Sequence, residues 1–249
     1  IMITETTSRH GDRSDDSERS LALRQVVMGN TGLSFPLFPP KVEGCAGGDV
    51  SQPLELEFDY DKVDPGMFLA PVATPGRGLE AWAPLMPPLS ERTNLGEGNT
   101  PMPEVPGLGD WAGTQTEVYL KDESRNPTWS HKDRLNRCTI SAAVLSDAPG
   151  VIVASSGNHG ASASAYAAAA GLPCIVLASA TAPRAMQAFV AAYGAAALAV
   201  PAQHRSTLMA PLRGAPGYHP VRNLPPHAHT GPAFAIEGYK SISFAIFRD

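Results

Sequence analysis

Residues 151–160 have the sequence Val-Ile-Val-Ala-Ser-Ser-Gly-Asn-His-Gly, and this stretch decides the fold. The first four residues are apolar and mostly β-branched, which is typical of a short strand buried on both faces. A polar loop follows over 155–160, and a run of small residues over 161–170 predicts a helix that Gly171 and Pro173 would end. The stretch is therefore predicted to form a strand, a loop and a helix in succession.

The same pattern repeats further along the chain. Residues 174–177 predict a second buried strand, 184–193 a second helix with Gly194 beyond its end, and 197–200 a third strand. Strands and helices that alternate at this spacing form parallel pairs with right-handed crossovers. We therefore predict an α/β fold built on a parallel sheet.

The flanking segments are less regular. Alternation over 117–121 predicts a strand, and Ser130 is the predicted N-cap of a helix that runs to about residue 146, with Asp133 completing a variant of the capping box. The segment 201–232 is rich in Pro, His and Gly and has no assignable element, whereas 237–249 has helical spacing. A helix after a third strand should lead into a fourth, so we expect the C-terminal part of the fold to be missing.

Composition excludes several classes of protein. The chain has 249 residues, 43% hydrophobic and 17% charged, with a formal net charge of -5 and basic residues scattered along it. A protein of this kind is not expected to bind nucleic acid or an anionic membrane surface. No apolar run reaches the roughly 20 residues of a membrane span, and residues 1–20 do not resemble a signal peptide. The expected location is cytoplasmic.

We divide the chain into three predicted regions. Residues 1–20 are polar and predict a flexible tail, 21–92 an accessory region with a half-buried strand at 54–60, and 93–249 the α/β fold. The three cysteines are too few and too far apart for a disulfide framework, and Cys138 and Cys174 are predicted core residues. Cys45 alone cannot make a four-ligand zinc site, so we predict no metal.

Two segments carry the chemistry. The loop 155–160 lies at the carboxyl end of a strand and at a helix start, where free N–H groups suit a carboxylate or phosphate; a capped strand-to-helix turn is the alternative. Lys132 is placed in the first turn of a helix, where a cation is unfavourable and an amine gains nucleophilic character. The alternative for Lys132 is a solvated lysine paired with Asp133, since such lysines are common.

Four motifs in order resemble the tryptophan-synthase-β-like family of pyridoxal-phosphate enzymes, and threonine synthases within it. They are residues 95–101 (Leu-Gly-Glu-Gly-Asn-Thr-Pro), 121–134 around Lys132, 155–160, and 237–242 (Glu-Gly-Tyr-Lys-Ser-Ile). The resemblance implies the family's three-layer fold over 93–249, with a mobile subdomain at about 155–230. It also implies a small amino-acid substrate, and a homodimer is the assembly common in the family.

The resemblance implies roles residue by residue. Lys132 would form the Schiff base with pyridoxal phosphate and move the α-proton, and Asn158 would hydrogen-bond the ring hydroxyl. The substrate carboxylate would be held by Ser155, Ser156, Gly157 and His159. Asp133 and Arg134 would brace the lysine helix. Trp129 and His131 stand where relatives more often have Gly and Phe, so Trp129 could narrow the pocket and His131 could be packing or an added acid or base.

Three functions remain open at this point. The first is a lyase of the threonine synthase type that converts O-phosphohomoserine to threonine, for which the Arg- and His-rich segment 204–229 offers a site for the substrate phosphate. The second is a serine or threonine dehydratase, or a β-replacement enzyme like cysteine synthase, that uses the same lysine. The third is a truncated or degenerate homologue without catalysis, because no glycine-rich loop for the cofactor phosphate follows Gly238.

Overall fold

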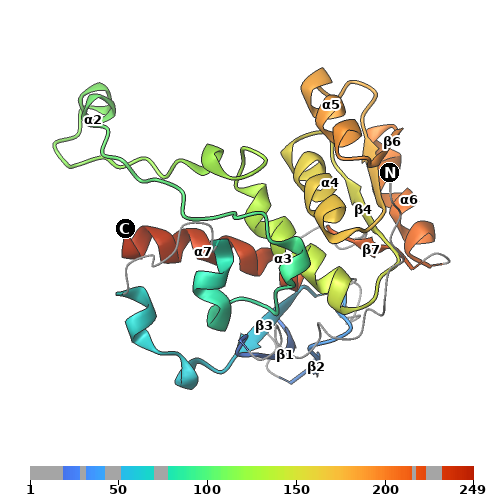
Figure 1. The fold of residues 1–249 in the computed structure, drawn as a ribbon, viewed down its shortest axis with the longest axis horizontal. Coiled ribbons are helices and arrows are strands. Elements are labelled where there is room, and N and C mark those ends of the chain that lie inside the picture. Colours follow the sequence, from blue (N-terminus) through green and yellow to red (C-terminus); the bar gives the residue numbers. More distant parts are fainter. Residues whose placement is uncertain (1–18, 29–31, 43–51, 70–77, 215–216, 223–231) are drawn as a thin grey trace, which may run out of the picture.

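The computed structural model describes residues 19–28, 32–42, 52–69, 78–214, 217–222 and 232–249 (Figure 1). Nearly all of the expected flexible tail, and Cys45, lie outside these residues. The strands are β1 (Ala22–Val27), β2 (Ser34–Pro36), β3 (Leu54–Phe58), β4 (Val151–Ala154), β5 (Cys174–Ala178), β6 (Ala196–Ala199) and β7 (His219–Pro220). The α-helices are α2 (Pro106–Ala112), α3 (Lys132–Leu145), α4 (Asn158–Ala170), α5 (Arg184–Ala192), α6 (Ala202–Gly214) and α7 (Ala233–Arg248).

A four-stranded sheet in the order β6-β5-β4-β7 organises the second half of the chain. All of its pairs are parallel, with Val151 opposite Cys174 and Ile175 opposite Ala196. The predicted α/β class and parallel pairing are therefore confirmed. Strand β7 lies in the segment without a predicted element, because two residues ending in a proline carry no periodic signal.

Helices cover both faces of this sheet (Figure 1). Val151 and Val153 of β4 face α3, α4 and α5 in one core cluster, whereas Ile152 and Ala154 face α6 in another. Successive strand residues point to opposite faces, so a continuously apolar strand such as β4 feeds both clusters. Cys138 and Cys174 are free thiols within the buried cores, as predicted.

The first part of the chain forms a smaller antiparallel sheet in the order β2-β1-β3. The predicted strand at 54–60 is confirmed over β3, whose Leu54, Leu56 and Phe58 are buried while Glu55 is exposed. These three side chains pack with Phe234 of α7 and Ala142 of α3. The smaller sheet is thus attached to the two helices that carry the lysine motif and the 237–242 motif.

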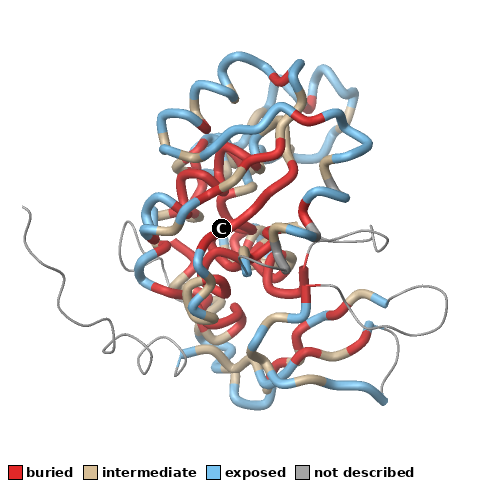
Figure 2. The backbone as a smooth tube through the Cα atoms, turned by 90° about the vertical axis from the view of Figure 1, so that its right-hand side faces the viewer, coloured by how far each residue is buried: buried red, intermediate tan, exposed pale blue. Residues whose placement is uncertain are grey.

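Helices α3 and α7 cross at very short range. A Cβ atom added to Gly238 would come within 2.6 Å of the Arg134 carbonyl carbon and 3.0 Å of the Leu135 nitrogen. Only glycine allows two helix backbones to approach so closely. Figure 2 shows that the most deeply buried backbone is gathered at the centre of the molecule, and α3 is buried along most of its length.

Two local predictions are wrong. Residues 117–121 do not form a strand; Tyr119 makes a single antiparallel bridge to Glu104. The neighbouring segment accepts hydrogen bonds at Pro101 and Pro103, but these prolines have no N–H to donate in return, so a regular ladder does not form. Helix α3 begins at Lys132 with His131 at the N-cap position, one residue later than Ser130 as N-cap implies. The Ser130 hydroxyl still accepts a hydrogen bond from the Lys132 backbone N–H (3.3 Å).

Candidate active site

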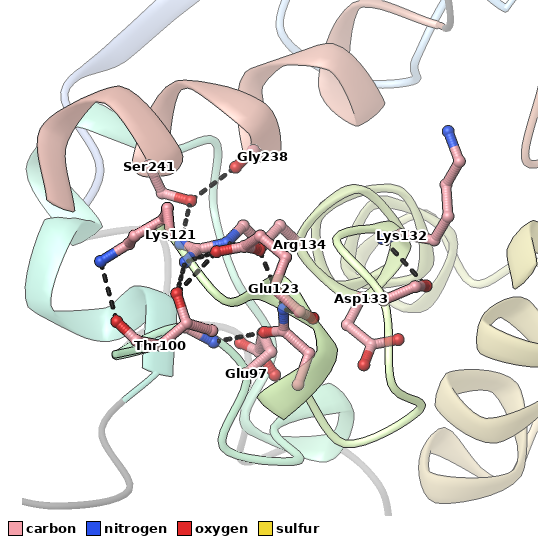
Figure 3. Close-up of polar contacts among 12 residues, drawn as sticks. Glu97, Thr100, Lys121, Glu123, Lys132, Asp133, Arg134, Gly238 and Ser241 are labelled. Carbon is pink, nitrogen blue, oxygen red and sulfur yellow. Dashed lines mark hydrogen bonds and ion pairs between the residues drawn. The ribbon is translucent and has the colours of Figure 1, made fainter. Parts of the chain in front are cut away.

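Lys132 occupies the first position of α3 and is partly buried. Its Nζ donates a hydrogen bond to the Tyr239 hydroxyl (2.7 Å) and lies 5.2 Å from the centre of that ring. No carboxylate lies within ion-pair distance of Nζ in the parts of the chain that the structure describes, so Asp133 does not pair with it. The side chain points away from the polar cluster around Arg134 (Figure 3).

Asp133 instead fixes the loop before the helix. Its carboxylate accepts hydrogen bonds from the Thr128 backbone N–H (2.6 Å), the Thr128 hydroxyl and the Ser162 hydroxyl (2.5 Å) of α4. Burial raises the pKa of Asp133, and these hydrogen bonds oppose the shift. The carboxylate therefore joins the lysine loop, α3 and α4 at one point, which is the bracing role expected for it.

Arg134 joins three of the sequence motifs (Figure 3). Its buried guanidinium donates to both carboxylate oxygens of Glu123 (2.7 and 2.8 Å), to the Thr100 hydroxyl (3.2 Å) and to the Ser241 hydroxyl (2.8 Å). Burial alone would raise the pKa of Glu123, but the hydrogen bonds from Arg134 and Thr100 outweigh it and lower that pKa. A bidentate, fully hydrogen-bonded pair is the geometry that offsets the desolvation of two buried charges.

The loop after β4 leaves its helix start open. Helix α4 begins at Asn158, which is exposed, and a Cβ atom added to Gly157 would meet nothing within 4 Å. Gly160 is different, because its Cβ would lie 3.2 Å from a Val176 methyl and 3.3 Å from the Ser155 carbonyl oxygen. The loop is thus packed tightly on β5 at one end and faces free space at Gly157, where helix N–H groups lack intrahelical acceptors.

The side chains of the loop differ in what they contact. The Ser155 hydroxyl accepts from the Gly157 N–H (3.3 Å), whereas the Ser156 hydroxyl accepts from the Ser179 N–H (2.7 Å) and from Arg205 (3.0 Å). His159 is held to α3 through its carbonyl, which accepts from the Asn136 amide (3.4 Å). Burial, followed by the charge of Lys132, lowers the pKa of the His159 ring to about 4. The ring is therefore neutral at pH 7, and the carboxylate-binding roles of these residues stay predictions.

Two arginines converge on the same edge of the sheet. Arg205 of α6 reaches the Ser156 hydroxyl, and Arg222, just after β7, donates to the Ala154 carbonyl (3.2 Å). Burial, and next the charge of Arg205, lower the pKa of Arg222. Neither guanidinium forms an ion pair with a carboxylate in the described ranges. Within the described part of the chain, this position therefore has positive charge without a compensating carboxylate.

Sequence reasoning missed part of this arrangement. Tyr239 and Thr100 had no assigned role, and Arg222 was included only as part of the segment 204–229, because their partners lie 107, 34 and 68 residues away along the chain. The spacing of motifs gives their order but not which side chains meet. At Trp129 the sequence did carry a signal, because relatives more often have glycine at this position. The φ of Trp129 is +60°, a conformation that favours glycine.

The fold and the site define a class of protein with a lysine at one helix start and an open polar loop at the next. The family model for pyridoxal-phosphate dependent enzymes matches residues 93–249, so the chain belongs to this family. It is 42% identical over 105 residues to threonine synthase of Synechocystis sp., covering 41% of this chain and 27% of the relative. It is 32% identical over 163 residues to threonine synthase of Bacillus sp., covering 64% and 44% respectively.

Solved structures agree on the fold. A pyridoxal 5'-phosphate-dependent aspartate racemase superposes with a TM-score of 0.53 at 24% identity, over 59% of this chain and 45% of that one. At this identity the likeness concerns the fold alone. The chain spans from about a quarter to less than half of the curated relatives it matches. No helix in the described residues is long and apolar enough to cross a membrane.

Pyridoxal phosphate is the cofactor of this family, and the described residues fit it in two respects. Lys132 is partly buried, and its amine has no carboxylate partner among the described residues, so an electrophilic aldehyde meets no ion pair there that must first be broken. The space beside Gly157 is open, which leaves room at the loop for a planar ring or an anionic group. Lys132 and Asn158 are the residues that would hold the cofactor.

Proposed function

We propose that this chain contributes the lysine half of a threonine-synthase-like lyase that acts on an amino acid with a phosphorylated side chain. The reaction would convert O-phosphohomoserine and water to threonine and inorganic phosphate. Lys132 would carry the cofactor and Asn158 would contact its ring. Ser155, Ser156, Gly157 and His159 would hold the substrate carboxylate.

One observation supports a phosphorylated substrate over a neutral one. Arg205 and Arg222 converge beside the loop 155–160 with no carboxylate partner among the described residues. Two like charges held near each other are unfavourable unless an anion joins them. A dianionic phosphate meets this requirement, and guanidinium groups suit its geometry. A substrate such as serine has no side-chain phosphate and would bring only its carboxylate.

Each group of residues would have a separate role in the proposed reaction. Pyridoxal phosphate, when bound, supplies the electron sink that stabilises negative charge at the substrate α-carbon. The Lys132 amine would accept and return the proton at that carbon. Backbone N–H groups at Gly157 and the start of α4 would orient the carboxylate. Arg222 and Arg205 would bind the phosphate and stabilise it as it leaves.

The test measures products from two substrates. The purified chain with pyridoxal phosphate is given O-phosphohomoserine, and threonine and inorganic phosphate are quantified; Lys132→Ala is the inactive control. Threonine and phosphate in equal amounts, absent in the control, support the proposal. A keto acid from serine or threonine without threonine formation indicates a dehydratase instead.

The arginine pair is tested separately. Arg222→Gln is expected to raise the KM for O-phosphohomoserine by about tenfold to a hundredfold, since a hydrogen bond to a charged group contributes about 1.5–3 kcal/mol. Arg92→Gln is the matched control, since Arg92 also donates to a backbone carbonyl but lies at Ala170, the other end of α4. An equal KM in the wild type and Arg222→Gln would remove the support for a phosphorylated substrate.

A further inference from the structure

Tyr239 is the only described residue whose side chain hydrogen-bonds the Lys132 amine. The distance between Nζ and the hydroxyl is 2.7 Å, and the amine also lies 5.2 Å from the ring centre. Both residues are partly buried. A charged amine held by a neutral phenol is unusual, because lysines more often pair with carboxylates.

The carboxylates next to Lys132 and to Tyr239 in the sequence are engaged elsewhere. Asp133 accepts hydrogen bonds from Thr128 and Ser162, and Glu237 forms an ion pair with Lys240. Among the described residues, the hydrogen-bond partner of the amine is thus a phenol and not a carboxylate.

The position of Tyr239 is set by its neighbours on α7. Gly238 brings the helix against the α3 backbone, and the Ser241 hydroxyl accepts from Arg134. The His131 ring lies 5.6 Å from the Tyr239 ring, tilted by 42°, on the side of the lysine loop. A hydroxyl fixed from both helices is a stationary partner for a flexible amine.

We propose that Tyr239 is a positioning residue that receives the Lys132 amine whenever this amine is not joined to the cofactor. A phenol hydroxyl can accept from an ammonium and can donate to a neutral amine, so it holds both protonation states. A carboxylate would favour the ammonium alone. A lysine that must both bond the cofactor and move a proton needs a partner that can hold the amine in both protonation states, as a phenol hydroxyl does. The functional meaning rests on the proposed role of Lys132.

The first test needs no cofactor. The cofactor-free chain is labelled with limiting trinitrobenzenesulfonate, and each lysine is quantified by peptide mass spectrometry. In Tyr239→Phe the Lys132 rate is expected to rise about fivefold, because one intramolecular hydrogen bond contributes about 1 kcal/mol. Rates at Lys62 and Lys240 should not change. Tyr119→Phe is the matched control, since it removes a hydroxyl that contacts Glu117 instead.

The second test uses the cofactor. With pyridoxal phosphate and borohydride, Tyr239→Phe should form the Lys132 adduct at a lower cofactor concentration, by about the same fivefold factor. Equal labelling of Lys132 in the wild type and Tyr239→Phe would overturn the inference. If Tyr239→Phe does not fold, His131→Leu takes its place, and a rise at Lys132 alone is again required. An absent adduct in the wild type contradicts the proposed function, while the labelling result still decides the role of Tyr239.

Discussion

Replacing Gly238 with alanine should weaken the fold, although glycine to alanine within a helix ordinarily stabilises it by about 1 kcal/mol. The new Cβ would lie 2.6 Å from the Arg134 carbonyl carbon, whereas carbon atoms in contact stand about 3.5–4.0 Å apart. Helix α7 must therefore move by about 1 Å relative to α3. Such overpacking costs about 1–3 kcal/mol. The shift would also strain the 2.8 Å hydrogen bond between Arg134 and Ser241.

We expect Gly238→Ala to lower the free energy of unfolding by about 3 kcal/mol, since the overpacking and the weakened charged hydrogen bond outweigh the helix propensity. The free energy of unfolding is measured by urea unfolding followed by circular dichroism. Gly107→Ala is the matched control, because Gly107 also lies in a helix and its Cβ would meet nothing within 4 Å. A Gly238→Ala chain as stable as Gly107→Ala would refute the close crossing of α3 and α7.

Three further predictions concern single side chains. Arg134→Met should lower the free energy of unfolding by about 3–5 kcal/mol in urea, because it leaves the Glu123 carboxylate without its buried partner; a loss below 1 kcal/mol would contradict the network. Trp129→Gly should leave the free energy of unfolding nearly unchanged, since relief of the backbone strain at φ +60° offsets the lost contact with Phe189 (5.0 Å between ring centres). Trp129→Ala keeps this strain and should lower the free energy of unfolding by about 1 kcal/mol. Burial lowers the pKa of His159 from 6.5 to about 4, so folding favours the neutral ring and stability is lost as pH falls through this window. The wild type should lose about 1.4 kcal/mol per pH unit more than His159→Gln between pH 6.5 and 4, and parallel stability curves would argue against a buried neutral ring.

The parallel sheet could be predicted because its strands are short, apolar and separated by helices of ordinary length. The side chains of residues 151–154 pack into a core cluster on each face of the sheet, so all four residues are apolar and form a continuous apolar run in the sequence. The start of α3 was predicted one residue too early, because Ser130 and Asp133 have the spacing of a capping box and yet Asp133 does not complete it. Asp133 turns to Thr128 and Ser162, a residue on another helix.

The site was predictable only where a residue type and a local position carry the signal. Lys132 at a helix start and the polar loop after β4 have such signals. The partners of Lys132 and of the loop do not: Tyr239 lies on α7, and Arg222 follows a two-residue strand. These contacts arise from the crossing of α3 with α7 and from the pairing of β7 with β4, which no local pattern records.

The most direct test of the central claim is to map the lysine that bonds the cofactor. The purified chain is incubated with pyridoxal phosphate, reduced with borohydride, digested and analysed by mass spectrometry, with Lys132→Ala alongside. The account predicts one adduct, on the peptide that contains Lys132, and its loss in Lys132→Ala. An adduct on another lysine that persists in Lys132→Ala, or no adduct on a folded chain, would contradict it.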